Sequence, residues 1–199
     1  MGYADELFDL TDRTVLITGG SRGLGREMAF AAAHCGADVI KTRVNERAGL
    51  PDQDPLTQVY SREQLSWIVA AAKKAGKGVL CHSYSQQGCY DAVMAGIRSL
   101  EHGVFVDERT RTEMKNRGTY FTPTLTAIAG MVGDKDPILD KRGRDFLPIL
   151  KQAVLTAHQM GVPLAAGTDS SGGVIEPIGR EVELMHEADA IAAEDMPII

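Results

Sequence analysis

The chain has 199 residues, enough for one hydrophobic core and short for two. Apolar residues make up 44% of it and charged residues 24%, with a net charge of -6. We therefore expect a globular protein, and the negative charge argues against electrostatic binding to nucleic acid or to an acidic membrane. No apolar run approaches the roughly 20 residues of a membrane-spanning helix.

The N-terminal stretch MGYADELFDLTDR is acidic and has no apolar segment, so it does not predict a secretion signal. The three cysteines, Cys35, Cys81 and Cys89, are far apart and form no CxxC pair of the metal-binding type. We expect them to be reduced thiols in a cytoplasmic protein.

Short β-rich runs alternate with helical patterns along the chain. The expected strands are residues 13–18, 37–41, 78–83, 97–103, 119–124 and 162–169. The expected helices are residues 25–36, 61–77, 87–96, 108–118, 144–161 and 179–193, with Pro148 in the first turns of the 144–161 helix. This alternation predicts a parallel α/β sheet, whose loops at the carboxyl ends of the strands carry the chemistry.

Several helix ends have recognisable capping residues. Ser61 followed by Gln64 has the pattern of a capping box at the start of the 61–77 helix, and Gly76 suits its end. Asp107 is suited to cap the 108–118 helix.

A glycine-rich loop, TGGSRGLG, directly follows the first expected strand. Glycines there permit a tight turn and close approach of the backbone to a phosphate, and the helix that follows offers free N–H groups. The alternative is a glycine turn that binds nothing. The candidate cofactor-binding residues are Thr18, Gly19, Ser21, Arg22, Gly23, Leu24 and Gly25.

The segment from Leu7 to Ile40 resembles the start of the short-chain dehydrogenase/reductase family. The resemblance implies weak binding of NAD(P), with Arg22 near an NADP phosphate. That family also needs a Tyr-x-x-x-Lys pair, and none of the five tyrosines here has a lysine four residues on. Its Asn-Asn-Ala-Gly segment is absent as well, so we do not expect hydride transfer.

From Gly36 onward, the segments GADVIK, VLCHSY, SLEHG, FTPTL and AAGTDSSGG resemble strands four to eight of the amidohydrolase superfamily. The imidazolonepropionase and prolidase-like enzymes are the most similar branch. The resemblance implies a barrel that holds divalent metal, with Zn²⁺ the expected ion. By residue-for-residue match, the resemblance places Lys41 at the carboxylated lysine and His82 and His102 at the two histidine ligands. It places Asp169 at the last-strand aspartate, which is both ligand and proton shuttle.

These residue types suit that chemistry. Neutral imidazoles and carboxylates bind Zn²⁺, a bound metal acidifies water, and a neighbouring aspartate can move the proton. Each residue alone has a plainer interpretation: a solvated lysine, a structural histidine, or an ordinary turn at GTDSSGG. Their joint occurrence at successive expected strand ends favours a metal site. We expect structural or solvent roles for His34, His158 and His186, which lie on expected helices.

One departure from the family concerns its first strand, which carries His-x-His. No His-x-His pair occurs in this sequence. One metal position therefore keeps Lys41, His82 and His102, while the other keeps only Lys41 and Asp169. We expect at most one tightly bound ion per chain and impaired hydrolysis of amide or cyclic amide bonds in a small-molecule substrate.

The two resemblances meet at GADVIKTR, Gly36 to Arg43, which fits a strand of either family. We interpret the chain as a chimera, natural or engineered. Residues 1–40 would form a Rossmann-type unit and residues 41–199 a partial barrel, and we expect the two to be fused into one domain. The predicted fold is α/β, with a partial TIM barrel preceded by one Rossmann-type βαβ unit.

Six strands are too few for an eight-stranded barrel. An open sheet, a smaller barrel and completion by a second copy all remain possible, and exposed sheet edges favour a homo-oligomer. Two other functions also stay open: a non-catalytic NAD(P)-binding module, and a recombined fold with no evolved activity.

Overall fold

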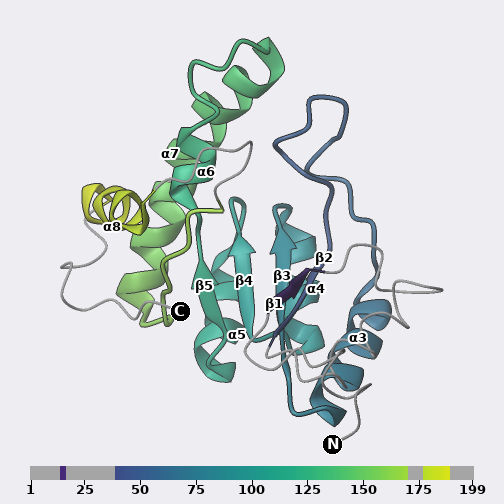
Figure 1. Cartoon of the computed structure of the whole chain (residues 1–199). Helices are drawn as coiled ribbons and strands as arrows, with labels where there is room; N and C mark the ends of the chain where they lie inside the picture. Colours follow the sequence, from purple (N-terminus) through teal and green to yellow (C-terminus); the bar gives the residue numbers. More distant parts are fainter. Residues whose placement is uncertain (1–13, 17–38, 170–176, 189–199) are drawn as a thin grey trace, which may run out of the picture.

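The computed structural model describes residues 14–16, 39–169 and 177–188, and strands alternate with helices through them (Figure 1). The strands are β1 (Thr14–Leu16), β2 (Val39–Arg43), β3 (Gly78–Ser83), β4 (Ser99–His102) and β5 (Tyr120–Thr122). The helices are α3 (Arg62–Lys74), α4 (Gln86–Ala95), α5 (Glu108–Arg117), α6 (Leu125–Ala129), α7 (Pro137–Met160) and α8 (Ile178–Glu187). None of these helices combines the length and the apolar character needed to cross a bilayer.

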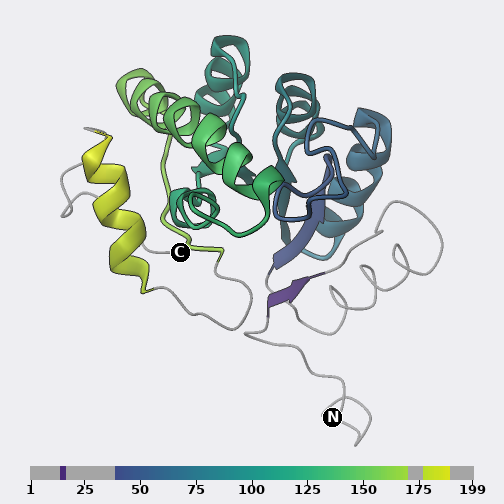
Figure 2. The ribbon, with the colours of Figure 1, turned by 90° about the horizontal axis from the view of Figure 1, so that it is seen from above.

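The five strands form one sheet in the order β1-β2-β3-β4-β5, and every neighbouring pair is parallel. Parallel strands in chain order are the arrangement of a (β/α) barrel. Figure 2 shows α3, α4 and α5 in an arc along the outer side of these strands. The expected parallel α/β fold with a partial barrel is therefore confirmed.

The expected sixth strand, residues 162–169, is not a continuous strand in the structure. The chain runs beside β5, where Phe121 N donates to the carbonyl of Pro163 at 2.9 Å and Ala165 N donates to that of Phe121 at 2.9 Å. A bridge joins Phe121 to Leu164, and Ala166 is a second bridge residue of the segment. Pro123 and Pro163 each lack the N–H that a longer ladder would need.

The capping box of Ser61 and Gln64 and the cap by Asp107 are both confirmed. Helix α7, however, is longer than expected. It begins at Pro137 because the side chain of Asp136 accepts hydrogen bonds from the first turn, and proline suits the first helical position. Pro148 consequently lies in the middle of the helix, not in its first turns. The short helix α6 was not expected.

The sheet has an apolar outer face and a polar inner face. Side chains alternate along each strand, and register partners share a face. On the outer face, the buried side chains of Ile40, Val79, Cys81, Leu100 and Phe121 belong to the hydrophobic core that includes residues of α3, α4 and α5. On the inner face, Arg43 pairs in register with His82, His82 with Glu101, and Glu101 with Thr122.

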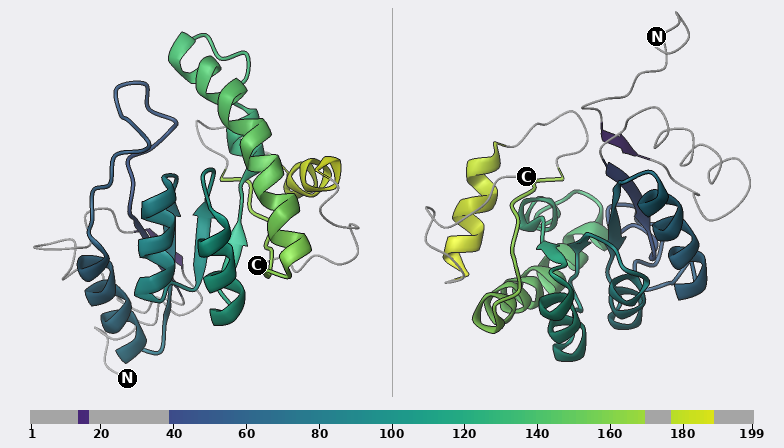
Figure 3. Two further views of the ribbon diagram at one scale, coloured as in Figure 1. Left: turned by 180° about the vertical axis from the view of Figure 1, so that it is seen from behind. Right: turned by 90° about the horizontal axis from the view of Figure 1, so that it is seen from below.

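A loop of residues 44–61 connects β2 to α3 and projects past the carboxyl ends of the strands, as does the start of α7 (Figure 3). Asn45, fully buried, anchors this loop. Its side-chain oxygen accepts hydrogen bonds from Tyr84 N at 2.9 Å and Ser85 N at 3.1 Å. Its amide nitrogen donates to Ser85 Oγ at 2.9 Å and to the carbonyl of Thr57 at 3.3 Å.

Arg142 of α7 ties the same loop to the helix. Its guanidinium donates to the carbonyls of Ala48 at 2.9 Å, Leu50 at 2.8 Å and Gln53. The loop is thus fixed near its start to the β3–α4 connection, and at residues 48–53 to α7.

We expect Asn45→Ala to lower the free energy of unfolding by about 3 kcal/mol, because the buried Tyr84 N–H and the half-buried Ser85 N–H lose the acceptor that they share. Urea denaturation measures the change. Asn116→Ala on the exposed side of α5 is the control, with an expected change within about 0.5 kcal/mol. Equal stabilities for the two variants would contradict the anchoring role.

Candidate active site

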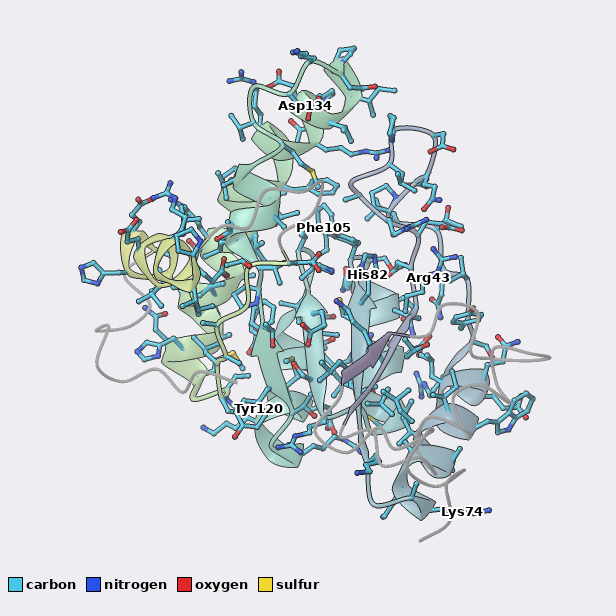
Figure 4. The ribbon with its side chains drawn as sticks, viewed as in Figure 1. Arg43, Lys74, His82, Phe105, Tyr120 and Asp134 are labelled. Carbon is cyan, nitrogen blue, oxygen red and sulfur yellow. The ribbon has the colours of Figure 1, made fainter. Side chains whose placement is uncertain are left out.

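The four residues proposed as metal ligands converge at the carboxyl ends of the strands. Lys41 Nζ lies 3.5 Å from Asp169 Oδ1, and His102 Nε2 lies 3.8 Å from Asp169 Oδ2. The ring centroids of His82 and His102 are 4.4 Å apart, with the planes at 76°. Figure 4 shows His82 and Arg43 beside each other at the ends of β3 and β2.

Backbone strain is concentrated at this place. Among the described residues, the non-glycine residues with a positive φ are His102 at 68°, Thr124 at 52° and Asp169 at 46°. Such conformations are uncommon outside glycine and cluster at functional sites. All three lie where a strand or the bridged 162–169 segment ends, so the strain marks the same site as the chemistry does.

The His102 ring is held on one side and has no hydrogen bond on the other. Its Nδ1 is 2.6 Å from Thr124 Oγ1, and its buried Nε2 has no hydrogen-bond partner among the described residues. The ring of Tyr84 stacks on it with centroids 5.0 Å apart and planes at 4°. The side chain is only 1% exposed, so the environment fixes the ring and leaves Nε2 as the nitrogen nearest Asp169.

The His82 ring is oriented by the backbone of the 44–61 loop. Its Nε2 lies 3.1 Å from the carbonyl oxygen of Glu46. A carbonyl oxygen only accepts, so Nε2 carries the proton and Nδ1 keeps the lone pair. The Tyr84 ring packs against this imidazole as well, with centroids 4.9 Å apart.

Both imidazoles are neutral at neutral pH. Burial lowers the pKa of His82 to about 2, with the neighbouring His102 contributing. Burial also lowers the pKa of His102 to about 3, and the charge of Lys41 adds to the effect. Neutral imidazole is the form that binds a metal, so both lone pairs are available as ligands.

The possible metal ligands at this site can hold one divalent ion only if Lys41 is one of them. The buried Nε2 of His102, which lacks a partner, is an atom that a metal would satisfy. Within the described ranges, no three His, Cys, Asp or Glu side chains are grouped closely enough to hold a metal. Lys41 would have to supply the further ligand. Its ammonium form repels a cation, so it fits as a neutral amine or as a carbamate.

Glu101 is a site residue that the sequence reasoning missed. It is 6% exposed, and its Oε1 accepts a hydrogen bond from Ser99 Oγ at 2.6 Å. Burial raises its pKa, while Ser99 and Lys41 act in the opposite direction. The signal was present in SLEHG, because alternation along β4 puts a glutamate beside His82 on the inner face.

The other residues singled out in the sequence either lie outside the described residues or lie away from the site. The glycine-loop residues Thr18, Gly19, Ser21, Arg22, Gly23, Leu24 and Gly25 lie outside the described residues, as do His34 and Cys35. His158 on α7 and His186 on α8 are exposed on their helices. Cys81 and Cys89 are buried free thiols, and burial raises the pKa of Cys81 to about 12.

The model of the amidohydrolase family matches residues 37–196. Ochratoxinase of Aspergillus niger is 31% identical over 142 residues, which is 69% of this chain and 30% of that protein. An uncharacterized protein of Mycobacterium tuberculosis is 29% identical over 143 residues, which is 69% of this chain and 36% of that protein. These matches give no support to the dehydrogenase resemblance of the N-terminal segment.

Solved structures are similar to this chain as well. A crystal structure of a Xaa-Pro dipeptidase with bound methionine aligns with a TM-score of 0.74 and 26% identity, covering 84% of this chain and 44% of that one. The structure of A. niger ochratoxinase aligns with a TM-score of 0.73 and 26% identity, covering 83% and 39%. The chain thus spans less than half the length of each of these relatives.

We expect acid to destabilise the fold because His82 and His102 resist protonation while folded. Their pKa values of about 2 and about 3 lie below the ordinary value of about 6.5. Below pH 6.5 the unfolded chain therefore binds more protons than the folded one. The contribution of the two histidines to the free energy of unfolding is fully present above that pH. It falls as the pH drops, by at most about 1.4 kcal/mol per pH unit for each histidine.

Urea unfolding of metal-free protein between pH 7.5 and 5.5 measures this slope. His82→Gln should remove roughly half of it. His158→Gln, at an exposed position, should leave it unchanged. A slope that is the same in the unmodified protein and in His82→Gln would contradict the assignment.

Proposed function

Because the chain belongs to the amidohydrolase family, we propose that it is a metal-dependent hydrolase of amide or cyclic amide bonds in small molecules. The observation that carries the proposal is the buried Nε2 of His102. Within the part of the chain that the structure describes, it has no hydrogen-bond partner. It lies 3.8 Å from the Asp169 carboxylate, which also contacts Lys41 at 3.5 Å. His82 adds a second neutral imidazole beside it.

In this proposal His82, His102 and Lys41 hold the ion, which when bound supplies an acidified water and polarises the substrate carbonyl. Asp169 removes the proton from the attacking water and later delivers it to the leaving nitrogen. A bond forms between the water oxygen and the carbonyl carbon, and the carbon–nitrogen bond breaks. The Asp169 side chain is 44% exposed, so substrate and water can reach it.

Lys41 needs a change of state for this role. In the structure its Nζ lies 3.5 Å from Asp169 Oδ1, as an ion pair. Attack of the neutral amine on CO₂ would form a carbamate and release a proton, which turns a repelling cation into an anionic ligand. We propose this carboxylation, as in the family resemblance, for the metal-loaded protein.

We further propose that hydrolysis by this chain alone is slow. The sequence has no His-x-His pair for a second ion, so the substrate carbonyl lacks a second electrostatic contact. Loss of one such contact costs about 3 kcal/mol, a factor of roughly a hundred or more in rate.

We expect at most one tightly bound Zn²⁺ per chain, together with slow hydrolysis of activated amides and of Xaa-Pro dipeptides. The dipeptides enter the panel because one similar structure is that of a Xaa-Pro dipeptidase. Elemental analysis gives the stoichiometry, and turnover is followed with added Zn²⁺, Mn²⁺ or Co²⁺. Both His82→Ala and Asp169→Asn should abolish the turnover, because one removes a ligand and the other the proton acceptor.

His158→Ala, at an exposed position on α7, is the matched control and should leave binding and turnover unchanged. Two stoichiometric ions on a monomer would refute the single-ion site. Turnover that survives both site variants would mean that these residues are relics, as a recombined chain without evolved activity would show.

A second function, binding of NAD(P), rests on the glycine-rich loop that follows β1. The parallel pairing of β1 with β2 is the arrangement that a βαβ unit requires. We expect weak NADP(H) binding, since the later strands of a dinucleotide-binding fold are missing. Fluorescence titration measures it, and Arg22→Ala should weaken NADPH more than NADH. No binding at millimolar cofactor would leave the loop a purely structural turn.

A further inference from the structure

Helix α6 begins beside the candidate site with an unusual cap. The first N–H groups of a helix have no partner within it, and a threonine at the N-cap normally accepts one of them. Thr124 occupies that position but makes no capping hydrogen bond with its side chain. Its hydroxyl instead lies 2.6 Å from His102 Nδ1. Another residue therefore has to cap the helix.

That residue is Glu181 of α8. Its Oε1 accepts from Leu125 N at 2.7 Å, and its Oε2 accepts from Thr126 N and Thr126 Oγ1, both at 2.7 Å. The carboxyl is fully buried. Burial raises its pKa, while the hydrogen bonds from residues 125 and 126 lower it. A distant helix thus supplies the capping carboxylate and leaves the Thr124 hydroxyl free for His102.

Thr124 is also held in an unfavourable conformation. Its φ is 52°, and a left-handed backbone costs a residue with a Cβ atom roughly 1–2 kcal/mol. A strained residue persists only where its surroundings determine it. The two N–H groups that follow Thr124 are both fixed by Glu181, so these hydrogen bonds oppose relaxation of the turn.

We propose that Glu181 is a positioning residue of the active site. By fixing the start of α6, it keeps Thr124 in the left-handed conformation that presents its hydroxyl to His102. The hydroxyl in turn orients the imidazole and leaves Nε2 nearest Asp169. The metal-affinity part of this inference rests on the proposed function, whereas the orientation of His102 does not.

The first measurement uses metal-free protein with ¹⁵N-labelled histidine. The imidazole nitrogen shifts report the tautomer and the hydrogen bond, and His102→Gln assigns the signals. Thr124→Val, which removes the hydroxyl and keeps the shape, should move both His102 shifts toward those of free imidazole. Glu181→Gln should move them in the same direction, because it replaces an acceptor oxygen with an N–H₂ donor. Thr124→Ser should restore the original shifts.

The second measurement is Zn²⁺ affinity by calorimetry. Residues that orient a metal-binding histidine typically contribute 10- to 100-fold to affinity, so Glu181→Gln should weaken binding by about 10-fold or more. If Glu181 acts through Thr124, the double variant with Thr124→Val should bind no more weakly than Thr124→Val alone. Failure of the unmodified protein to bind Zn²⁺ would refute the proposed function and leave the first measurement intact.

Leu184→Ala on α8 separates positioning from stability. Leu184 is 2% exposed, so its truncation destabilises the protein without touching the hydrogen bonds of Glu181. It should lower the free energy of unfolding and leave the His102 shifts unchanged. Should Glu181→Gln fail to fold, Thr126→Val removes one of the three bonds and should give a smaller shift of the same sign. Unchanged His102 shifts and Zn²⁺ affinity in Glu181→Gln or Thr126→Val would overturn the proposal and reduce Glu181 to a link between helices.

Discussion

Each strand of this parallel sheet presents its side chains alternately to two different surroundings, and that constraint determines where the core and the site can lie. Val79 and Cys81 pack into the hydrophobic core, so His82 must face the other way, in register with Glu101 of the next strand. The polar residues of the inner face are therefore brought together by the apolar pattern of the outer face. A shift of one residue in register would turn His82 toward the helices and the apolar side chains toward the inner face.

The sequence was sufficient for the five paired strands, for two helix caps and for the convergence of Lys41, His102 and Asp169, because these follow from local patterns and from the shared edge of parallel strands. It was insufficient where a contact joins distant segments. Glu181 caps a helix 55 residues earlier in the chain, and no local pattern encodes such a cap. The start of α7 was missed because its polar first turns depend on Asp136 and Pro137 more than on apolar periodicity. The division into two units at residue 40 stays a prediction.

Ionisable side chains and strained backbone conformations occur together at the candidate site. The Lys41 ammonium forms an ion pair with the Asp169 carboxylate. Its charge also acts on Glu101, whose pKa is raised by burial. Two imidazoles next to them are kept neutral by burial. His102, Thr124 and Asp169 are each held in a left-handed conformation that the fold must maintain at a cost. These arrangements reduce stability locally, which is the pattern expected where side chains are arranged for chemistry.

Arg142 couples the movement of the 44–61 loop to that of α7. Its guanidinium bonds to three loop carbonyls, and the same loop supplies the Glu46 carbonyl that sets the tautomer of His82. An excursion of the loop must break these bonds together, so the loop and the start of α7 should open as one cooperative unit. During such an opening the Glu46 carbonyl would leave His82, and the imidazole could then exchange its proton with solvent. The rate at which the start of α7 and the loop open together would thereby set how often His82 changes tautomer.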